Sequence, residues 1–230
     1  MFRLLRTLEE SGYILQDSRS RVYRPTLKLV SLGHVVARTH NLESIAYPIM
    51  EDLRSRTGET VYLVGREGDE AVALINLESS HLNRISAQPG RRWPLGQGAA
   101  GLALLLTLSR NLLAQFLERH PEMRERFEHA RDRYESDGVT FVDGRHDDIH
   151  DEGVMAVGTP IQSHVGGLRV ALAVAWPISR STADYNALRL MLLESAATLH
   201  RAFGGDIPTG RPSDGQPRAN VPWKEVAATD

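Results

Sequence analysis

Hydrophobic and polar positions change their spacing three times within the first 25 residues. Apolar residues recur at helical intervals over residues 2–8, and Gly12 then provides a helix stop. Two short alternating segments, residues 13–15 and 22–24, flank a polar turn at residues 17–20. The pattern predicts a helix followed by a two-stranded hairpin, which are the last elements of a winged helix-turn-helix.

Residues 26–57 predict two consecutive helices. Over residues 26–40 the apolar positions line one side, so this linker helix needs a partner surface. Asn41 is suited to cap the second helix and Gly58 to end it. The expected buried positions of the second helix are Ile45, Ile49 and Leu53.

From residue 59 onward the chain predicts a mixed domain of strands and helices. The expected strands are residues 59–64, 70–78, 83–87, 139–142, 154–161 and 167–176. A loop over residues 88–94 and a small-residue run over 96–101 precede the expected helices, which are residues from about Leu102, 111–118, 121–134 and 181–203. Short connections favour antiparallel pairing, and the two long helices would cover one face of the sheet.

Composition narrows the class of protein. The chain has no cysteine, which excludes a disulfide framework and thiol chemistry. It shows neither the apolar run of a signal peptide nor a segment long enough to span a bilayer, so we expect a cytoplasmic protein. The net charge is −2, yet residues 1–28 hold six Arg or Lys against three Asp or Glu. A basic end is typical of a segment that contacts the phosphate groups of nucleic acid, although a chance asymmetry of a few charges explains it equally well.

Motifs for catalysis and metal binding are weak. The sequence contains no Gly-x-Ser-x-Gly, no phosphate loop and no triad spacing, so we expect neither an enzyme nor a cofactor. His146 and His150 would share one face of a helix, which suits Zn²⁺. A polar loop is the simpler interpretation of residues 146–151, and no metal is assigned there.

Short segments along the chain together resemble the isocitrate lyase regulator (IclR-type) family of bacterial transcription factors. They are residues 2–8 with Gly12-Tyr13, 23–25, 57–61, 90–95, 153–161 and 176–180. Their order and spacing carry the resemblance from Phe2 to Gly205. It implies an α+β protein with three parts: a partial winged helix-turn-helix (1–25), a linker helix (26–41), and a GAF-like effector-binding domain with an antiparallel sheet flanked by helices (42–205). Residues 206–230 follow as a tail.

The tail contains four prolines and two glycines without a periodic pattern, so we expect it to be disordered. The resemblance further implies a homodimer or a dimer of dimers. Its partners would be DNA and a small organic acid, which acts as the effector.

The small-residue run over residues 96–101 is the best candidate for the rim of an effector site. Small residues let backbone N–H groups approach a ligand, and the following helix would point its positive end at an anion. A tight turn with close helix packing explains the run without a ligand, but in relatives the same turn lines the effector cavity. The residues assigned around this rim are Leu95, Gly98, Ala99, Ala100 and Asp148.

The opposite wall is expected to come from two apolar strands, through Met155, Val157, Ala173 and Ala175. Relatives that bind very small acids carry serines at the two alanine positions, so we expect a larger and more apolar effector, for instance an aromatic acid. Trp93 is a further candidate, either as a stacking wall or as an exposed aromatic residue. Arg91 and Arg92 would attract an anion or remain solvated surface charges.

The residues expected to face DNA are Arg3, Arg6, Thr7, Arg19 and Arg21. The helices that normally precede a reading helix do not occur in the sequence, which leaves two explanations open. Met1 is an internal methionine of a longer ligand-responsive regulator, or the chain is a small-molecule sensor that lacks DNA binding.

Overall fold

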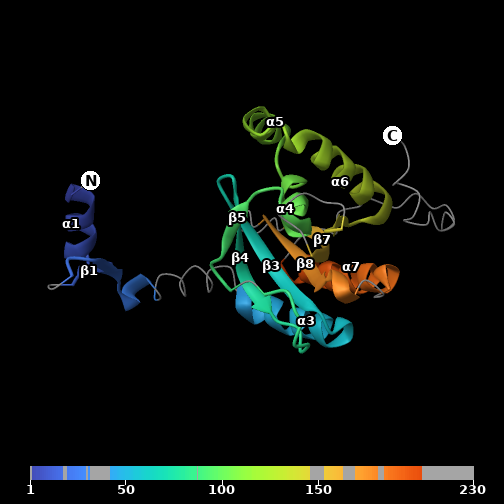
Figure 1. Cartoon of the computed structure of the whole chain (residues 1–230), viewed down its shortest axis with the longest axis horizontal. Coiled ribbons are helices and arrows are strands. Elements are labelled where there is room, and N and C mark those ends of the chain that lie inside the picture. The colour runs from blue at the N-terminus through green and yellow to red at the C-terminus, as the bar shows by residue number, and fades with distance from the viewer. Residues whose placement is uncertain are drawn as a thin grey trace. The chain divides into compact units, whose positions relative to one another are not determined.

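The computed structural model describes residues 2–17, 20–29, 31, 42–86, 88–145, 153–162, 169–180 and 184–203. Within these ranges no helix is long and apolar enough to cross a bilayer. The chain divides into two compact units, residues 1–49 and 50–230 (Figure 1). The expectations for Arg19, Asn41, most of the linker helix, residues 146–151 and the tail lie outside the described residues.

The first unit contains the helix and hairpin that the sequence predicts. Its elements are α1 (Phe2–Glu10), β1 (Ile14–Gln16) and β2 (Tyr23–Pro25), and the two strands pair antiparallel. Gly12 follows α1 with a φ of 72°, a conformation that residues with a side chain adopt only at a cost. Thr26 Oγ1 donates a hydrogen bond of 2.6 Å to the Gly12 carbonyl, and Lys28 Nζ donates one of 2.8 Å to Ser11. The hairpin exit is therefore fastened to the turn that ends α1.

The helix α3 (Leu42–Thr57) ends where the sequence predicts, at Gly58. Its buried face is turned by one residue relative to the prediction, although Leu53 is buried as expected. The fully buried positions are Ala46, Met50 and Leu53, whereas Ile45 and Ile49 are only half-buried. Residues 27–29 and 31 are helical and belong to the predicted linker helix.

The second unit is built on an antiparallel sheet with the strand order β5-β4-β3-β8-β7-β6. The strands are β3 (Thr60–Glu67), β4 (Glu70–Leu77), β5 (Arg92–Pro94), β6 (Thr140–Asp143), β7 (Val154–Gln162) and β8 (Arg169–Pro177). The strand predicted at residues 83–87 is wrong, since 83–86 are irregular. The edge strand β5 lies inside the expected loop instead, because three residues are too few to show an alternating pattern.

Helices cover both faces of this sheet (Figure 1). They are α4 (Gly98–Leu105), α5 (Arg110–Arg119), α6 (Met123–Asp137) and α7 (Tyr185–Ala202). Consecutive residues of β6 identify the two faces, because they point in opposite directions. Thr140 bonds to α4, whereas Phe141 packs edge-to-face on Tyr185 of α7. The prediction that the long helices α6 and α7 share a face is wrong, since Phe127 and Ala130 of α6 join the hydrophobic cluster around α4.

An ion pair joins two distant segments at one end of the sheet. Glu59, just before β3, is 4% exposed and receives two hydrogen bonds, of 2.7 and 2.6 Å, from the guanidinium of Arg180. Arg180 follows β8 and also donates to the Asn83 carbonyl at 2.6 Å. The arrangement ties together the ends of two neighbouring strands and the irregular segment beside them.

We predict that Glu59→Gln lowers the free energy of unfolding by about 2–3 kcal/mol, because it removes a charge-assisted bidentate contact from a buried site. The measurement is urea unfolding followed by circular dichroism. Arg56→Gln is the control, since it breaks the exposed pair of Arg56 with Glu194 and should change stability far less. Equal effects of the two substitutions would contradict the structural role of the Glu59–Arg180 pair.

Candidate functional site

The candidate site forms where the first turn of α4 meets the sheet. A Cβ atom added to Gly158 of β7 would lie 2.8 Å from the carbonyl carbon and oxygen of Ala99. Thr140, the partner of Gly158 on β6, donates from Oγ1 to the same Ala99 oxygen at 2.7 Å. The backbone of α4 therefore rests directly on the sheet, and the site depends on a position that carries no side chain.

The helix α4 begins at Gly98, four residues before the predicted start near Leu102. Gly98, Ala99 and Ala100 thus form the first turn of the helix and are not a loop before it. Gln97 occupies the N-cap position, and its side chain makes no capping hydrogen bond. The positive end of the helix dipole consequently lies within the small-residue segment that the sequence marked as the rim.

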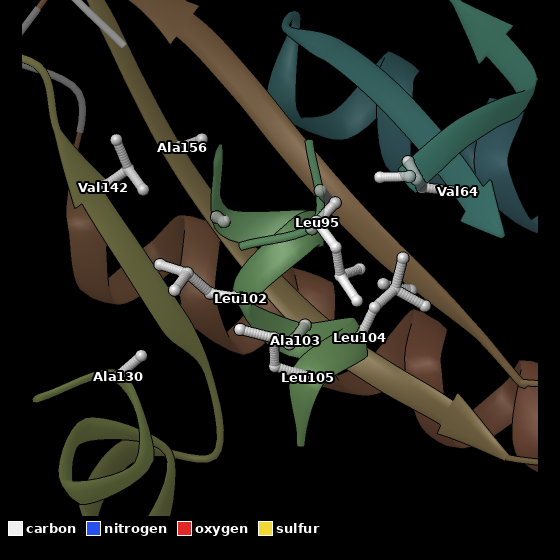
Figure 2. Close-up of a cluster of buried hydrophobic side chains, with 14 of the residues drawn as sticks. Val64, Leu95, Leu102, Ala103, Leu104, Leu105, Ala130, Val142 and Ala156 are labelled. Atoms are coloured by element: carbon white, nitrogen blue, oxygen red, sulfur yellow. The ribbon is translucent and has the colours of Figure 1, made fainter. Parts of the chain in front are cut away.

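Small and polar residues form two rows across the face of the sheet beneath α4. The first row, in register order from β4 to β6, is Asn76, Tyr62, Ala173, Gly158 and Thr140. The second row, from β3 to β6, is Thr60, Ala175, Ala156 and Val142. Figure 2 shows Ala156 and Val142 close to the side chains of α4, including Leu102. The three alanines of these rows provide a floor of single methyl groups, which we call the alanine floor: Ala156, Ala173 and Ala175.

The predicted wall of Met155, Val157, Ala173 and Ala175 is wrong as a single surface. Met155 and Val157 pair with Trp176 and Val174, so they lie on the face opposite to the alanine floor. A one-residue offset turns every side chain of a strand to the other face. Because β7 is buried on both faces, its apolar run gives no indication of which residues point toward α4.

Leu95 and Trp93 lie beside the start of α4. Leu95 is 2% exposed and belongs to the same cluster as the alanine floor. Trp93 is half-buried, packs against that cluster and donates from Nε1 to the Gln97 carbonyl at 3.3 Å. This placement favours the interpretation of Trp93 as a stacking wall over that of an exposed aromatic residue.

The structure describes the contacts of the two arginine candidates, but not the segment considered for metal binding. Arg92 pairs with Glu67 and, at 2.7 Å, with Glu70, which favours a surface charge. Arg91 donates to the Ser86 carbonyl at 3.3 Å. The described residues contain no group of three or more His, Asp or Glu side chains placed to hold a metal ion. Asp148 and the histidines at 146 and 150 lie outside those residues.

Two polar side chains that the sequence analysis missed face the same cluster. Tyr62 is 7% exposed, and within the described structure its hydroxyl has no hydrogen-bond partner. The same holds there for Oδ1 of Asn76, which pairs with Tyr62 across β3 and β4. Burial raises the pKa of Tyr62 above its ordinary value, Arg91 lowers it and Glu78 raises it. The hydroxyl therefore keeps its proton at neutral pH.

A β-bulge explains why Asn76 lies opposite Tyr62. The register pairs Val64 with Ala73 but Leu63 with Ile75, so Leu74 is an extra residue in β4. Without this bulge the alternation would place Ile75 opposite Tyr62. The sequence of β4 is apolar without interruption from Ala71 to Ile75 and therefore gives no sign of the irregularity.

The described residues among those expected to face DNA lie on α1 and in the hairpin turn. Arg3 is exposed, whereas Arg6 forms a 2.8 Å ion pair with Glu10 one turn later on the helix. Thr7 Oγ1 donates to the Arg3 carbonyl at 3.0 Å. Arg21 is exposed and has a φ of 59° in the turn between the strands. Two cations, Arg3 and Arg21, thus project into solvent from neighbouring elements of the first unit.

We predict that Gly158→Ala lowers the free energy of unfolding by about 1–3 kcal/mol, because its methyl group would collide with the backbone of α4 and not with a movable side chain. Thr140→Val keeps the shape of the side chain, removes the bond to Ala99 and should cost about 1 kcal/mol. Urea unfolding measures both. Unchanged stability of Gly158→Ala would show that α4 does not rest on β7.

A family model and a relative of known type both match most of this chain. The family model described as bacterial transcriptional regulator IclR C-terminal matches residues 34–201. The HTH-type transcriptional repressor AllR of Escherichia coli (strain K12) is 30% identical over 196 residues, which cover 80% of this chain and 69% of that repressor.

Solved structures share the fold. An IclR-type transcriptional regulator from Silicibacter sp. TM1040 superposes with a TM-score of 0.78 at 22% identity, over 92% of this chain and 86% of that one. The IclR protein of Thermotoga maritima gives a TM-score of 0.64 at 24% identity, over 88% and 84% of the two chains. With the family model matched over most of its length and a repressor of that family as a relative, this chain belongs to the IclR family of bacterial transcriptional regulators.

Proposed function

We propose that this chain is a ligand-responsive DNA-binding transcriptional regulator whose second unit binds a small organic acid against the alanine floor. The observation that carries the proposal is the position of the first turn of α4 beside three adjacent alanines of β7 and β8. A helix N-terminus favours a carboxylate, and methyl-sized side chains present a shallow apolar surface to a ligand body. Leu95, Trp93, Gly98, Ala99 and Ala100 flank the ligand, and Asp148 is a further proposed contact.

The composition of the alanine floor favours an effector larger and more apolar than a two- or three-carbon acid. Ala173 and Ala175 offer no hydroxyl groups, so they contribute surface contact and not hydrogen bonds. Val64 and Ala171 extend the same face with further apolar side chains. An aromatic acid presents a carboxylate for α4 and a flat apolar body for the sheet.

DNA is proposed to contact α1 and the β1–β2 hairpin. Arg3 and Arg21 supply exposed positive charge, Arg6 and Thr7 lie on the same helix as Arg3, and Arg19 is assigned to the hairpin turn. Arginine contacts to phosphate position a protein on the duplex. The regulator acts as a homodimer or a dimer of dimers, which pairs two reading elements on DNA.

A sensor module without DNA affinity is the alternative function. It is favoured by the packing of α1, on which no described apolar side chain is fully buried and Leu4 is 66% exposed. Short helices depend on packing for most of their stability. A helix that is incompletely covered would hold Arg3 and Arg6 less firmly.

For the effector, we predict that benzoate binds more tightly than pyruvate in isothermal titration calorimetry. Ala175→Leu should weaken benzoate binding at least about tenfold, because the larger side chain occupies the alanine floor. Ala114→Leu, at an exposed position of α5, is the matched control and should leave the affinity unchanged. Tighter binding of pyruvate would refute the apolar effector, and full affinity in Ala175→Leu would refute the location.

For DNA, we predict binding to random-sequence duplex DNA that weakens steeply as salt rises, measured by gel shift. The double variant Arg3→Gln/Arg21→Gln should bind more weakly and with a shallower salt dependence, because fewer phosphates are neutralised. Arg201→Gln, an exposed arginine near the end of α7, is the control. Failure of the 230-residue chain to shift DNA at low salt would favour the sensor module.

A further inference from the structure

Two buried polar atoms on the α4 face of the sheet have no hydrogen-bond partner in the described part of the chain. They are the hydroxyl of Tyr62 and Oδ1 of Asn76. Most buried polar groups in native proteins are hydrogen-bonded, so such atoms need an explanation. These two occupy directly paired positions of β3 and β4, which makes them one feature and not two separate defects.

The position of this pair connects it to the alanine floor. Tyr62 is also paired with Ala173 of β8, the neighbouring strand on its other side. Adjacent strands lie about 4.8 Å apart, so a ligand lying on Ala173 would be within contact of Tyr62. Trp176 also has a buried nitrogen without a partner among the described residues, but it pairs with Met155 and lies on the opposite face.

Charges of both signs act on Tyr62. Arg91 and Glu78 shift the pKa of Tyr62 in opposite directions. The Glu78 carboxylate is itself bonded to Arg84 at 2.7 Å and to the Ser86 hydroxyl. The two unpartnered groups at this end, a protonated phenol and a carboxamide, are themselves uncharged and so suit an uncharged polar partner, in contrast to the positive end of α4.

We propose that Tyr62 and Asn76 recognise a second, uncharged polar group of the effector that both accepts and donates a hydrogen bond, such as a hydroxyl. The inference rests on the proposed effector site on the alanine floor. The Tyr62 hydroxyl donates a hydrogen bond to the oxygen of this group, and Oδ1 of Asn76 accepts a hydrogen bond from the O–H of the same group. The effector is thus a hydroxylated carboxylic acid whose carboxylate lies toward α4, and Tyr62 supplies the hydroxyl that Ala173 and Ala175 do not.

The test compares 4-hydroxybenzoate with benzoate, which differ by one hydroxyl group, in calorimetric titrations of the full chain. In the parent chain 4-hydroxybenzoate should bind more tightly. Tyr62→Phe should weaken the binding of 4-hydroxybenzoate by about fivefold to tenfold, which is the effect of one hydrogen bond, and should leave the affinity for benzoate unchanged. Asn76→Ala should reduce the same preference for the hydroxylated acid.

Tyr185→Phe is the matched control, because Tyr185 packs on Phe141 on the face opposite to the alanine floor and its hydroxyl bonds at 3.2 Å to both Arg133 and Asp137. It should lower the melting temperature of the unliganded chain and leave both affinities unchanged. Tyr62→Phe should not lower that temperature, because it removes a hydroxyl that has no partner in the described structure.

The outcomes separate the two proposals. If Ala175→Leu abolishes binding of both acids while Tyr62→Phe leaves their ratio unchanged, the effector site stands and the role of Tyr62 is overturned. If Ala175→Leu changes neither affinity, the site itself is misplaced. Absence of saturable binding of 4-hydroxybenzoate at millimolar concentration overturns the proposed ligand class.

Discussion

The contact between α4 and Gly158 is the constraint on which the candidate site depends. A helix backbone rarely lies against a strand without intervening side chains, and here the missing Cβ of Gly158 permits an approach that Thr140 then fixes through the Ala99 carbonyl. The positive end of α4 is thereby held at a set height above Ala156 and Ala173. Any side chain at residue 158 would lift the helix and separate its N–H groups from the alanine floor.

The second constraint acts at the end of the same strands. Glu59 and Arg180 belong to segments that lie 121 residues apart in the sequence, and both were part of the resemblance to the IclR family. Their ion pair holds the start of β3 next to the end of β8, which keeps Tyr62 in register with Ala173. The same strand pairing thus serves the stability of the sheet and the arrangement of polar and apolar groups on its α4 face.

Much of the fold could be predicted from the sequence, because its signals are local. The stop at Gly58, the hairpin after Gly12 and the apolar strands β7 and β8 were all evident from spacing and turn residues. The start of α4 was placed too late because glycine and alanine carry no periodic pattern. The sequence correctly predicts Ala173 and Ala175 as part of the surface beneath α4, but it selects Met155 and Val157 of β7 in place of Ala156. The reason is that β7 is buried on both faces, so its sequence does not show which residues point toward α4.

The bulge at Leu74 decides which residue of β4 lies next to Tyr62 on the α4 face of the sheet. Asn76 lies opposite Tyr62 only because β4 contains one residue more than its partner requires, and a regular ladder would present Ile75 there. A shift of the pairing by a single residue would therefore exchange a polar neighbour for an apolar one while every amino acid stayed the same. Among proteins of this fold, ligand preference can consequently diverge through insertions and deletions in the β3–β4 hairpin as readily as through substitutions in the alanine floor.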